Sequence, residues 1–313
     1  MYAIAAGSPN YTSSGTSKFI PEIWAAALLE NFYPSTCFTD ISNTEYSGQI
    51  TQQGSKVIIR TIPETTVRAY VRGQDLVYDS YESPTVEMEI DKSNYFGHRA
   101  NALDKKQADV DYISSWARDA AQRMTIATDV DMLNNIYTGA HASNKGATAG
   151  KRTLSYDLGA ATAPFAATKG NIVDKIVDLG SVLSENDVPR EGRWVVFPTH
   201  FMNLIKKSEI KDASLTGDSS SVIRNGRVGM IDTFTLYESN NYTGVADTYL
   251  GAAVTAFHIL FGIAKATGFA TQMDSVETLK NPREPGDLIR GWNLYGYKVI
   301  KSQGLGDFYA FKA

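Results

Sequence analysis

Apolar residues recur every three or four positions over one long stretch of the chain, shortly after a segment that alternates strictly. Apolar and polar side chains alternate over residues 85–91, which is typical of a half-buried β-strand. The longer stretch carries apolar or small residues on one helical face, at Val110, Ile113, Ala117, Ala120, Met124, Ala127, Val130, Leu133 and Tyr137. Asp104 can cap the start of this helix, and Gly139 can end it in the left-handed conformation. The pattern predicts a helix over 104–138 that is roughly 50 Å long and acts as a strut.

A second strand is expected over residues 54–62, where Val57, Ile58, Ile59 and Ile62 are apolar. It can pair antiparallel with residues 85–91, which leaves the polar stretch 63–84 as an elongated tip. An isolated two-stranded hairpin is only marginally stable in water. We therefore expect this hairpin to lie against a neighbouring subunit.

The remaining pattern predicts several shorter elements. Residues 1–18 form an extended polar arm, and Pro21 lies in the first turn of a short helix over 19–31. A helix over 171–185 has Ile172, Ile176, Leu179 and Leu183 in one row, and a buried strand follows at 194–197, then a helix from Pro198. Further segments are a tight turn at 224–227, an alternating strand at 230–237, a strand with a short helix over 249–270, and closing strands at 288–300 and 305–312. The architecture is α+β, with two projections that a compact monomer does not need.

Charge and cysteine content exclude several classes of protein. The 30 basic and 34 acidic residues are interspersed and give a net charge of −4. No basic block marks a nucleic-acid or membrane surface, and no apolar window is long enough to span a membrane. Residues 1–17 lack the features of a secretory signal. Because Cys37 is the single cysteine, an internal disulfide is excluded.

The sequence contains no motif that predicts catalysis, a metal or a cofactor. The four histidines are isolated and show no metal-ligand spacing. Asp129-Val130-Asp131 begins like a calcium loop but lacks the later glycine and acidic residue, so a solvated helix face is the better interpretation. Residues 291–296 have the glycine spacing of a phosphate loop, but Tyr297 stands where the lysine is needed. We expect no enzyme activity.

Charged residues gather on the hairpin tip and on the long helix. The candidates for contacts between subunits are Arg68, Arg72, Asp75, Asp79, Glu82, Asp109, Arg118 and Arg123. One exposed ion pair contributes about 0–1 kcal/mol. Repeated across an assembly, such pairs can fix register and orientation.

Several segments, in this order, carry a resemblance to a known family. They are Phe19-Ile20-Pro21-Glu22-Ile23-Trp24, Gly73-Gln74-Asp75-Leu76, Ile90-Asp91-Lys92-Ser93-Asn94-Tyr95-Phe96, Asp104-Lys105-Lys106-Gln107, Val188-Pro189-Arg190-Glu191-Gly192-Arg193-Trp194, Tyr237-Glu238-Ser239-Asn240-Asn241 and the run from Gly291 to Val299. Together with the order of arm, hairpin, strut helix and closing strands, they resemble major capsid proteins of tailed bacteriophages. The resemblance covers nearly the whole chain.

That resemblance implies the Hong Kong 97-like fold and a division of the chain. Residues 1–45 are the N-terminal arm and short helix, and 46–101 the extended loop, a β-hairpin. Residues 102–169 form the peripheral domain with the spine helix 104–138. Residues 170–270 form the axial domain, and 271–313 return to the peripheral domain.

The implied function is self-assembly into an icosahedral head. On this hypothesis, pentamers and hexamers enclose double-stranded DNA without sequence-specific binding, and no membrane is involved. A separate scaffolding protein, a portal and a decoration protein are the implied partners, and the location is the virion after assembly in the host cytoplasm. An encapsulin-like nanocompartment shell is the alternative within the fold. A soluble hydrolase or ligand-binding domain is the alternative from another class, and it needs a convergent polar pocket.

Overall fold

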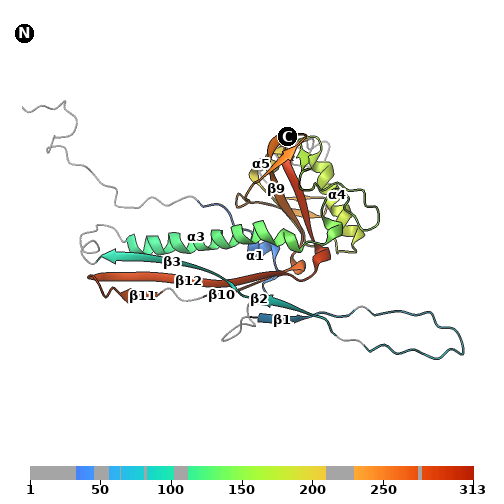
Figure 1. Cartoon of the computed structure of the whole chain (residues 1–313), viewed down its shortest axis with the longest axis horizontal. Coiled ribbons are helices and arrows are strands. Elements are labelled where there is room, and N and C mark those ends of the chain that lie inside the picture. Colours follow the sequence, from blue (N-terminus) through green and yellow to red (C-terminus); the bar gives the residue numbers. More distant parts are fainter. Residues whose placement is uncertain are drawn as a thin grey trace, which may run out of the picture.

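The computed structural model describes residues 33–45, 56–63, 65–80, 83–101, 112–208, 229–273 and 277–313. The predicted arm, the helix over 19–31, the first turns of the long helix at 104–111 and the turn at 224–227 lie outside the described residues. The molecule is elongated. A long helix over a sheet extends to one side, a body of sheet and helices lies at the centre, and a hairpin projects on the opposite side (Figure 1).

The body is built on a seven-stranded sheet of order β4-β13-β9-β5-β7-β6, with β8 paired to β9. Its strands are β4 Phe165–Ala167, β5 Arg193–Phe197, β6 Met230–Ile231, β7 Phe234–Glu238, β8 Val245–Tyr249, β9 Ala252–Ile263 and β13 Leu305–Lys312. Helices α4 Ile172–Glu185 and α5 Thr199–Lys206 pack on one face in a single apolar cluster. The opposite face packs on the end of α3 Tyr112–Asn135 and on α1 Phe38–Ile41.

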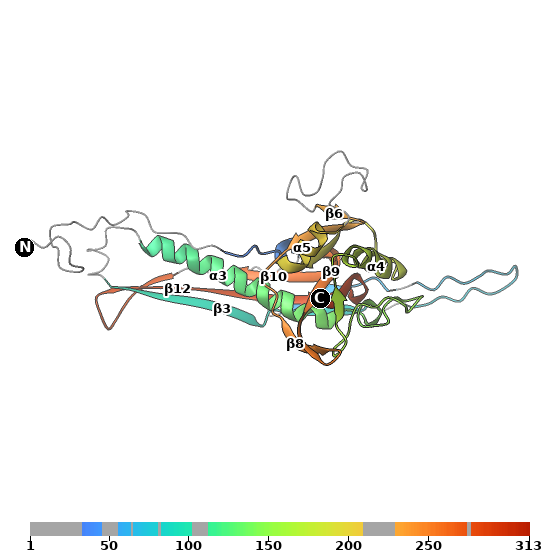
Figure 2. The same cartoon turned by 90° about the horizontal axis from the view of Figure 1, so that it is seen from above.

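The second sheet has β12 Gly286–Val299 at its centre. β10 Thr267–Met273 and β11 Glu277–Lys280 pair with one edge of β12, and β3 Lys92–Asn101 pairs with the other. Helix α3 runs along one face of this sheet (Figure 2). The two sheets are therefore joined by the long helix as well as by the chain itself.

The hairpin begins as a two-stranded sheet of β1 Lys56–Arg60 and β2 Thr85–Glu89. Val57, Ile59 and Met88 form a small buried cluster with Ala270 of β10. This anchors the base of the hairpin on the second sheet, while residues 65–80 extend away from the body (Figure 1).

Several predicted elements are confirmed. The strands at 85–91 and 54–62 pair antiparallel as expected. All four apolar residues of the row in α4 are fully buried, and every side chain of β5 is buried. The closing strands appear as β12 and β13, separated from one another by the 3-10 turn η6 Ser302–Gly304.

Other predictions are wrong. The alternating strand at 230–237 is two strands, β6 and β7, with a tight turn at Asp232, whose φ is +54°. Strands β3 and β8 were not predicted. Residues 271–313 were expected to return together to the peripheral domain, but the two closing strands lie in different sheets. β12 lies in the four-stranded sheet, and β13 pairs with β9 and β4 in the seven-stranded sheet.

The end of the long helix differs from the prediction too. Helix α3 passes into the 3-10 helix η2 Ile136–Gly139, and Gly139 is not left-handed. A Cβ atom at Gly139 would lie 2.5 Å from Cγ2 of Val299. Glycine is needed here because β12 approaches the backbone closely, not because a left-handed residue ends the helix.

Candidate functional site

The projecting part of the hairpin exposes apolar side chains along its whole length. Every residue from 65 to 80 is exposed, and Ile62 and Val67 are 94% and 91% accessible. Tyr70, Val71, Leu76, Val77 and Tyr78 are exposed as well. Large exposed apolar patches mark contact sites for other molecules. The hairpin therefore presents a surface that this chain does not cover itself.

Two of the candidate contact residues pair with each other across the hairpin. Nη1 and Nη2 of Arg68 donate to Oδ2 and Oδ1 of Asp79, at 2.7 and 2.9 Å. This hydrogen-bonded ion pair raises the pKa of Arg68. The two parallel hydrogen bonds hold the two sides of the hairpin together beyond the ends of β1 and β2, so these residues stiffen the hairpin itself.

The tip of the hairpin carries two further candidates, Arg72 and Asp75. Gly73 between them has φ +92°, and the N–H of Gln74 donates to the carbonyl of Val71 in a tight turn. Both charged side chains are exposed, and within the described residues neither has an ion-pair partner. Glu82 lies outside the described residues. The tip therefore presents two opposite charges to the outside.

The candidates on the long helix do not join the hairpin. Nε of Arg123 donates to Oδ2 of Asp119 one turn earlier, at 2.8 Å. Arg118 is exposed on the same helix, and Asp109 lies outside the described residues. The predicted candidates thus form at least two separate surfaces on the described part of the chain.

The most enclosed charge on α3 was missed by the sequence analysis. Asp129 was expected on a solvated helix face, but its side chain is fully buried. Its Oδ1 accepts from the backbone N–H groups of Cys37 and Phe38, at 3.0 and 2.9 Å, and its Oδ2 accepts from Nδ2 of Asn241 at 2.6 Å. Asp129 therefore caps the first turn of α1 and ties that segment to the long helix.

Asp131 anchors the second sheet in a similar way. Nζ of Lys92 donates to Oδ2 of Asp131 and to the hydroxyl of Tyr297, both at 2.7 Å. Partial burial lowers the pKa of Lys92, but these hydrogen bonds outweigh it and raise the pKa overall. Burial, followed by the nearby charge of Asp131, raises the pKa of Tyr295 to about 12. Both aspartates thus lie within helix α3 and accept hydrogen bonds from groups of the protein itself.

The open face of the second sheet carries exposed aromatic side chains. Tyr95 of β3 lies opposite Trp292 of β12 in the register, and both are exposed. They border a hollow of about 480 Å³, together with an ion pair between Arg290 and Glu277 at 2.7 Å. This face is a second surface suited to contact with another chain.

Chemical sites are sparse in the parts of the chain that the structure describes. There, no three residues among histidine, cysteine, aspartate and glutamate come close enough to hold a metal ion. The closest approach to a catalytic pair is Nδ1 of His258, 2.8 Å from Oδ2 of the buried Asp307. Tyr137 stacks on the His258 ring at a centroid distance of 3.8 Å. These contacts are typical of a packed histidine.

Across the same described stretches, no helix combines the length and the apolar character that crossing a membrane requires.

Comparison with known proteins gives a consistent result. A family model described as phage capsid protein matches residues 99–310, more than half of the chain. A chain from Mycobacterium phage Che8 superposes with a TM-score of 0.74 at 24% identity, covering 93% of this chain and 97% of that one. The capsid of Cyanophage P-SCSP1u gives a TM-score of 0.73 at 16% identity, covering 96% of both chains.

The capsid of a native GTA particle is also similar, with a TM-score of 0.66 at 13% identity over 94% of this chain and 96% of that one. These superpositions establish a shared fold. No curated protein sequence matches the chain significantly.

Proposed function

Because this chain belongs to the phage capsid protein family, we propose that it is the major subunit of a tailed-phage head. Copies assemble by non-covalent contacts into pentamers and hexamers, and these close into an icosahedral shell. In this proposal the extended loop lies within residues 46–101, whose last strand β3 pairs with β12 in the second sheet. Residues 102–169 hold the spine helix, and 170–270 form the axial domain. β13 joins the sheet of the axial domain.

The observation that supports this proposal most directly is the exposed apolar surface of the hairpin. Residues 65–80 are all exposed although seven large apolar side chains lie along residues 62–78. Burial of apolar surface contributes about 25 cal/mol per Å², so covering this hairpin favours association strongly. A neighbouring copy of the same chain is present at high local concentration in a shell and can cover it.

Deletion of residues 65–82 tests the role of the hairpin. The base formed by β1 and β2 remains anchored on the second sheet by Met88 and Ala270, so we expect circular dichroism of the isolated subunit to stay unchanged. Sedimentation and negative-stain imaging should show no closed shells. A normal yield of shells from the deletion variant would refute the overlap of the hairpin with a neighbour.

The contents of the particle separate a phage head from a nanocompartment. In this proposal the shell encloses double-stranded DNA without sequence-specific contacts. Purified particles should then protect genome-length DNA from nuclease. Particles that carry a protein cargo and no DNA would favour the encapsulin-like alternative.

Further partners follow from the same proposal. A separate scaffolding protein guides assembly, a portal occupies one vertex, and a decoration protein binds the outside. Assembly takes place in the host cytoplasm, and the chain acts without catalysing a reaction or holding a cofactor. Co-purification of assembly intermediates from infected cells, followed by mass spectrometry, tests these partners.

A further inference from the structure

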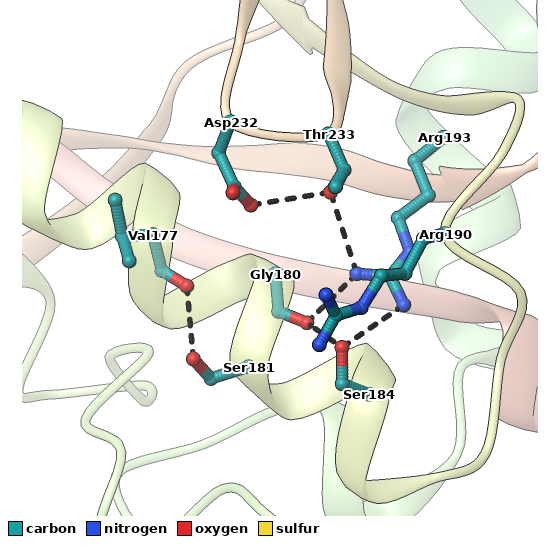
Figure 3. A pocket seen from close by; sticks show the side chains of 8 residues that line it. All are labelled: Val177, Gly180, Ser181, Ser184, Arg190, Arg193, Asp232 and Thr233. Carbon is teal, nitrogen blue, oxygen red and sulfur yellow. Dashed lines mark hydrogen bonds between the residues drawn. The ribbon is translucent and has the colours of Figure 1, made fainter.

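A hollow of about 240 Å³ lies between α4, the turn before β5 and the turn between β6 and β7 (Figure 3). Hydroxyl groups and charged side chains dominate its wall. Arg190 reaches it from the turn before β5, and Asp232 reaches it from the opposite side, on the turn between β6 and β7. We call it the charged hollow.

Arg193 forms the fixed floor of the charged hollow. Its guanidinium is buried and donates to the carbonyls of Gly180, Val188 and Pro189, at 2.8, 2.7 and 2.9 Å. It also reaches the hydroxyls of Ser184 and Thr233. All of these acceptors are neutral, and together they occupy every N–H direction of the guanidinium. Arg193 therefore shapes the hollow and has no donor left for a ligand.

Arg190 and Asp232 remain available. Both are exposed, and within the described part of the chain neither forms an ion pair. The carboxylate of Asp232 accepts one bond, from the hydroxyl of Thr233 at 3.1 Å. The charge of Asp232 acts on the buried guanidinium of Arg193, although the two groups form no hydrogen bond. Arg190 and Asp232 thus face one hollow without an ion pair between them, and together they match a group that carries the reverse arrangement.

The local backbone brings Asp232 close to α4. Gly180 lies inside α4, where glycine costs about 1 kcal/mol relative to alanine, and a Cβ atom there would lie 2.6 Å from Oδ2 of Asp232. Asp232 itself has φ +54°, in the left-handed region. Both features keep the carboxylate of Asp232 at the hollow. A two-residue turn between the paired residues Ile231 and Phe234 accounts for the left-handed conformation of Asp232.

The hairpin tip carries the reverse arrangement of charges. Arg72 and Asp75 are exposed on either side of the turn at Gly73 and have no ion-pair partner within the described residues. The hairpin projects away from the body that holds the charged hollow (Figures 1 and 2). The tip therefore cannot enter the hollow of its own chain, whereas the tip of another copy can.

We propose that the charged hollow receives the hairpin tip of a second copy, with Asp75 facing Arg190 and Arg72 facing Asp232. This inference rests on the proposed function, because both require copies side by side. A volume of about 240 Å³ suits charged side chains rather than a folded element. The apolar length of the hairpin supplies most of the binding energy, and the charged tip fixes its register, as complementary charges do at interfaces.

Charge reversal with rescue tests the pairing in the full-length chain. Arg190→Glu and Asp75→Arg should each lower the yield of closed shells about tenfold, since each places like charges in contact. The double variant restores the attraction and should recover most of the yield. Arg283→Glu is the matched control, because Arg283 is exposed on a remote turn and should assemble normally. Circular dichroism confirms folding of each variant.

The outcomes separate this inference from the proposed function. Normal shells from Arg190→Glu would overturn the charged hollow as a contact and leave the capsid role intact. Loss in both single variants without recovery in the double variant would overturn the hairpin tip as the occupant.

A cross-linking experiment covers the case in which a reversed charge prevents folding. Gln74→Cys combined with Ser181→Cys should give disulfide-linked multimers when assembled particles are oxidised. Each single cysteine variant is the control, and Cys37 is buried and does not contribute. Absence of linked multimers from the double variant in assembled particles would overturn the proposal.

Discussion

The last strand, β13, and the projecting hairpin are both rich in apolar side chains, but those of β13 are buried and those of the hairpin are exposed. In β13 every residue from 305 to 311 is buried between β9 and β4. In the hairpin every residue from 65 to 80 is exposed. Burial in β13 is complete within one chain, whereas the hairpin needs a surface from elsewhere. The difference separates the part of the molecule that stabilises the subunit from the part that builds the shell.

The largest effect on stability is expected in β13. Phe308 is fully buried and its ring lies 5.5 Å from that of Phe165. Phe308→Ala should lower the free energy of unfolding by about 4 kcal/mol, as lost burial and a cavity combine. Urea denaturation of the isolated subunit measures it. Tyr78→Ala, an equal loss of a ring on the exposed hairpin, is the control and should change little; equal losses would break the comparison.

A somewhat smaller loss is expected at Asp129. Asp129→Ala removes the acceptor of the N–H groups of Cys37 and Phe38 and of the Asn241 amide. Buried donors without a partner cost about 1–3 kcal/mol each, so we expect a loss of about 3 kcal/mol by urea denaturation. Hydrogen exchange at residues 37 and 38 should quicken. Arg123→Ala, which breaks only an exposed pair, serves for comparison, and unchanged exchange in Asp129→Ala would contradict the capping role.

Glu185 gives a small, pH-dependent effect near the surface of the body. Its carboxylate accepts from the N–H of Arg152 at 2.8 Å and from Thr153, and these bonds lower its pKa below the ordinary 4.5. A lowered pKa in the folded state stabilises the protein above pH 4.5, and this contribution is lost as the pH falls through the folded value. Glu185→Gln should therefore melt slightly below wild type at pH 7.

The difference in melting temperature between Glu185→Gln and wild type should disappear as the solution is acidified well below pH 4.5. Glu191→Gln is the matched control, because Glu191 is exposed and has no hydrogen bond within the described residues. A gap that persists unchanged in acid would show that packing, not the carboxylate, causes the difference.

The smallest effect on the subunit is expected in the hairpin. Replacing Val67, Tyr70 and Tyr78 together by serine should change the unfolding free energy of the isolated chain by less than about 0.5 kcal/mol, since all three are exposed. Shell yield, measured by sedimentation, should nevertheless collapse. A subunit that melts much earlier than wild type would show that the hairpin packs on its own body.

The sequence predicted those helices and strands whose residues are buried at regular intervals, because regular burial leaves a periodic pattern of apolar residues. The row in α4 and the run in β5 are visible because each position meets the same buried face. Asp129 was misplaced because its partners Cys37 and Asn241 are 92 and 112 residues away. No local period reveals such partners. For the same reason the sheet that holds β13 could not be read from its own sequence.

The candidate contact residues show the same limit. Arg68 and Asp79 stand 11 residues apart, and a hairpin brings them together across its two sides. Arg190 and Asp232 reach one hollow only through the parallel pairing of β5 with β7. A charge pattern alone could not predict that juxtaposition, whereas the exposed charges of the tip follow directly from its turn.

The position of β13 has a consequence for the order of events during synthesis. This strand lies between β4 and β9, so the edge strand β4 stays separated from the rest of the seven-stranded sheet until residues 305–312 arrive. The ribosome makes these residues after every other described element. A nascent chain therefore holds an unfinished body, and pairing so distant in sequence forms slowly. Translation of the last strand therefore delays the completion of the folded subunit, and with it the assembly of that subunit with other copies.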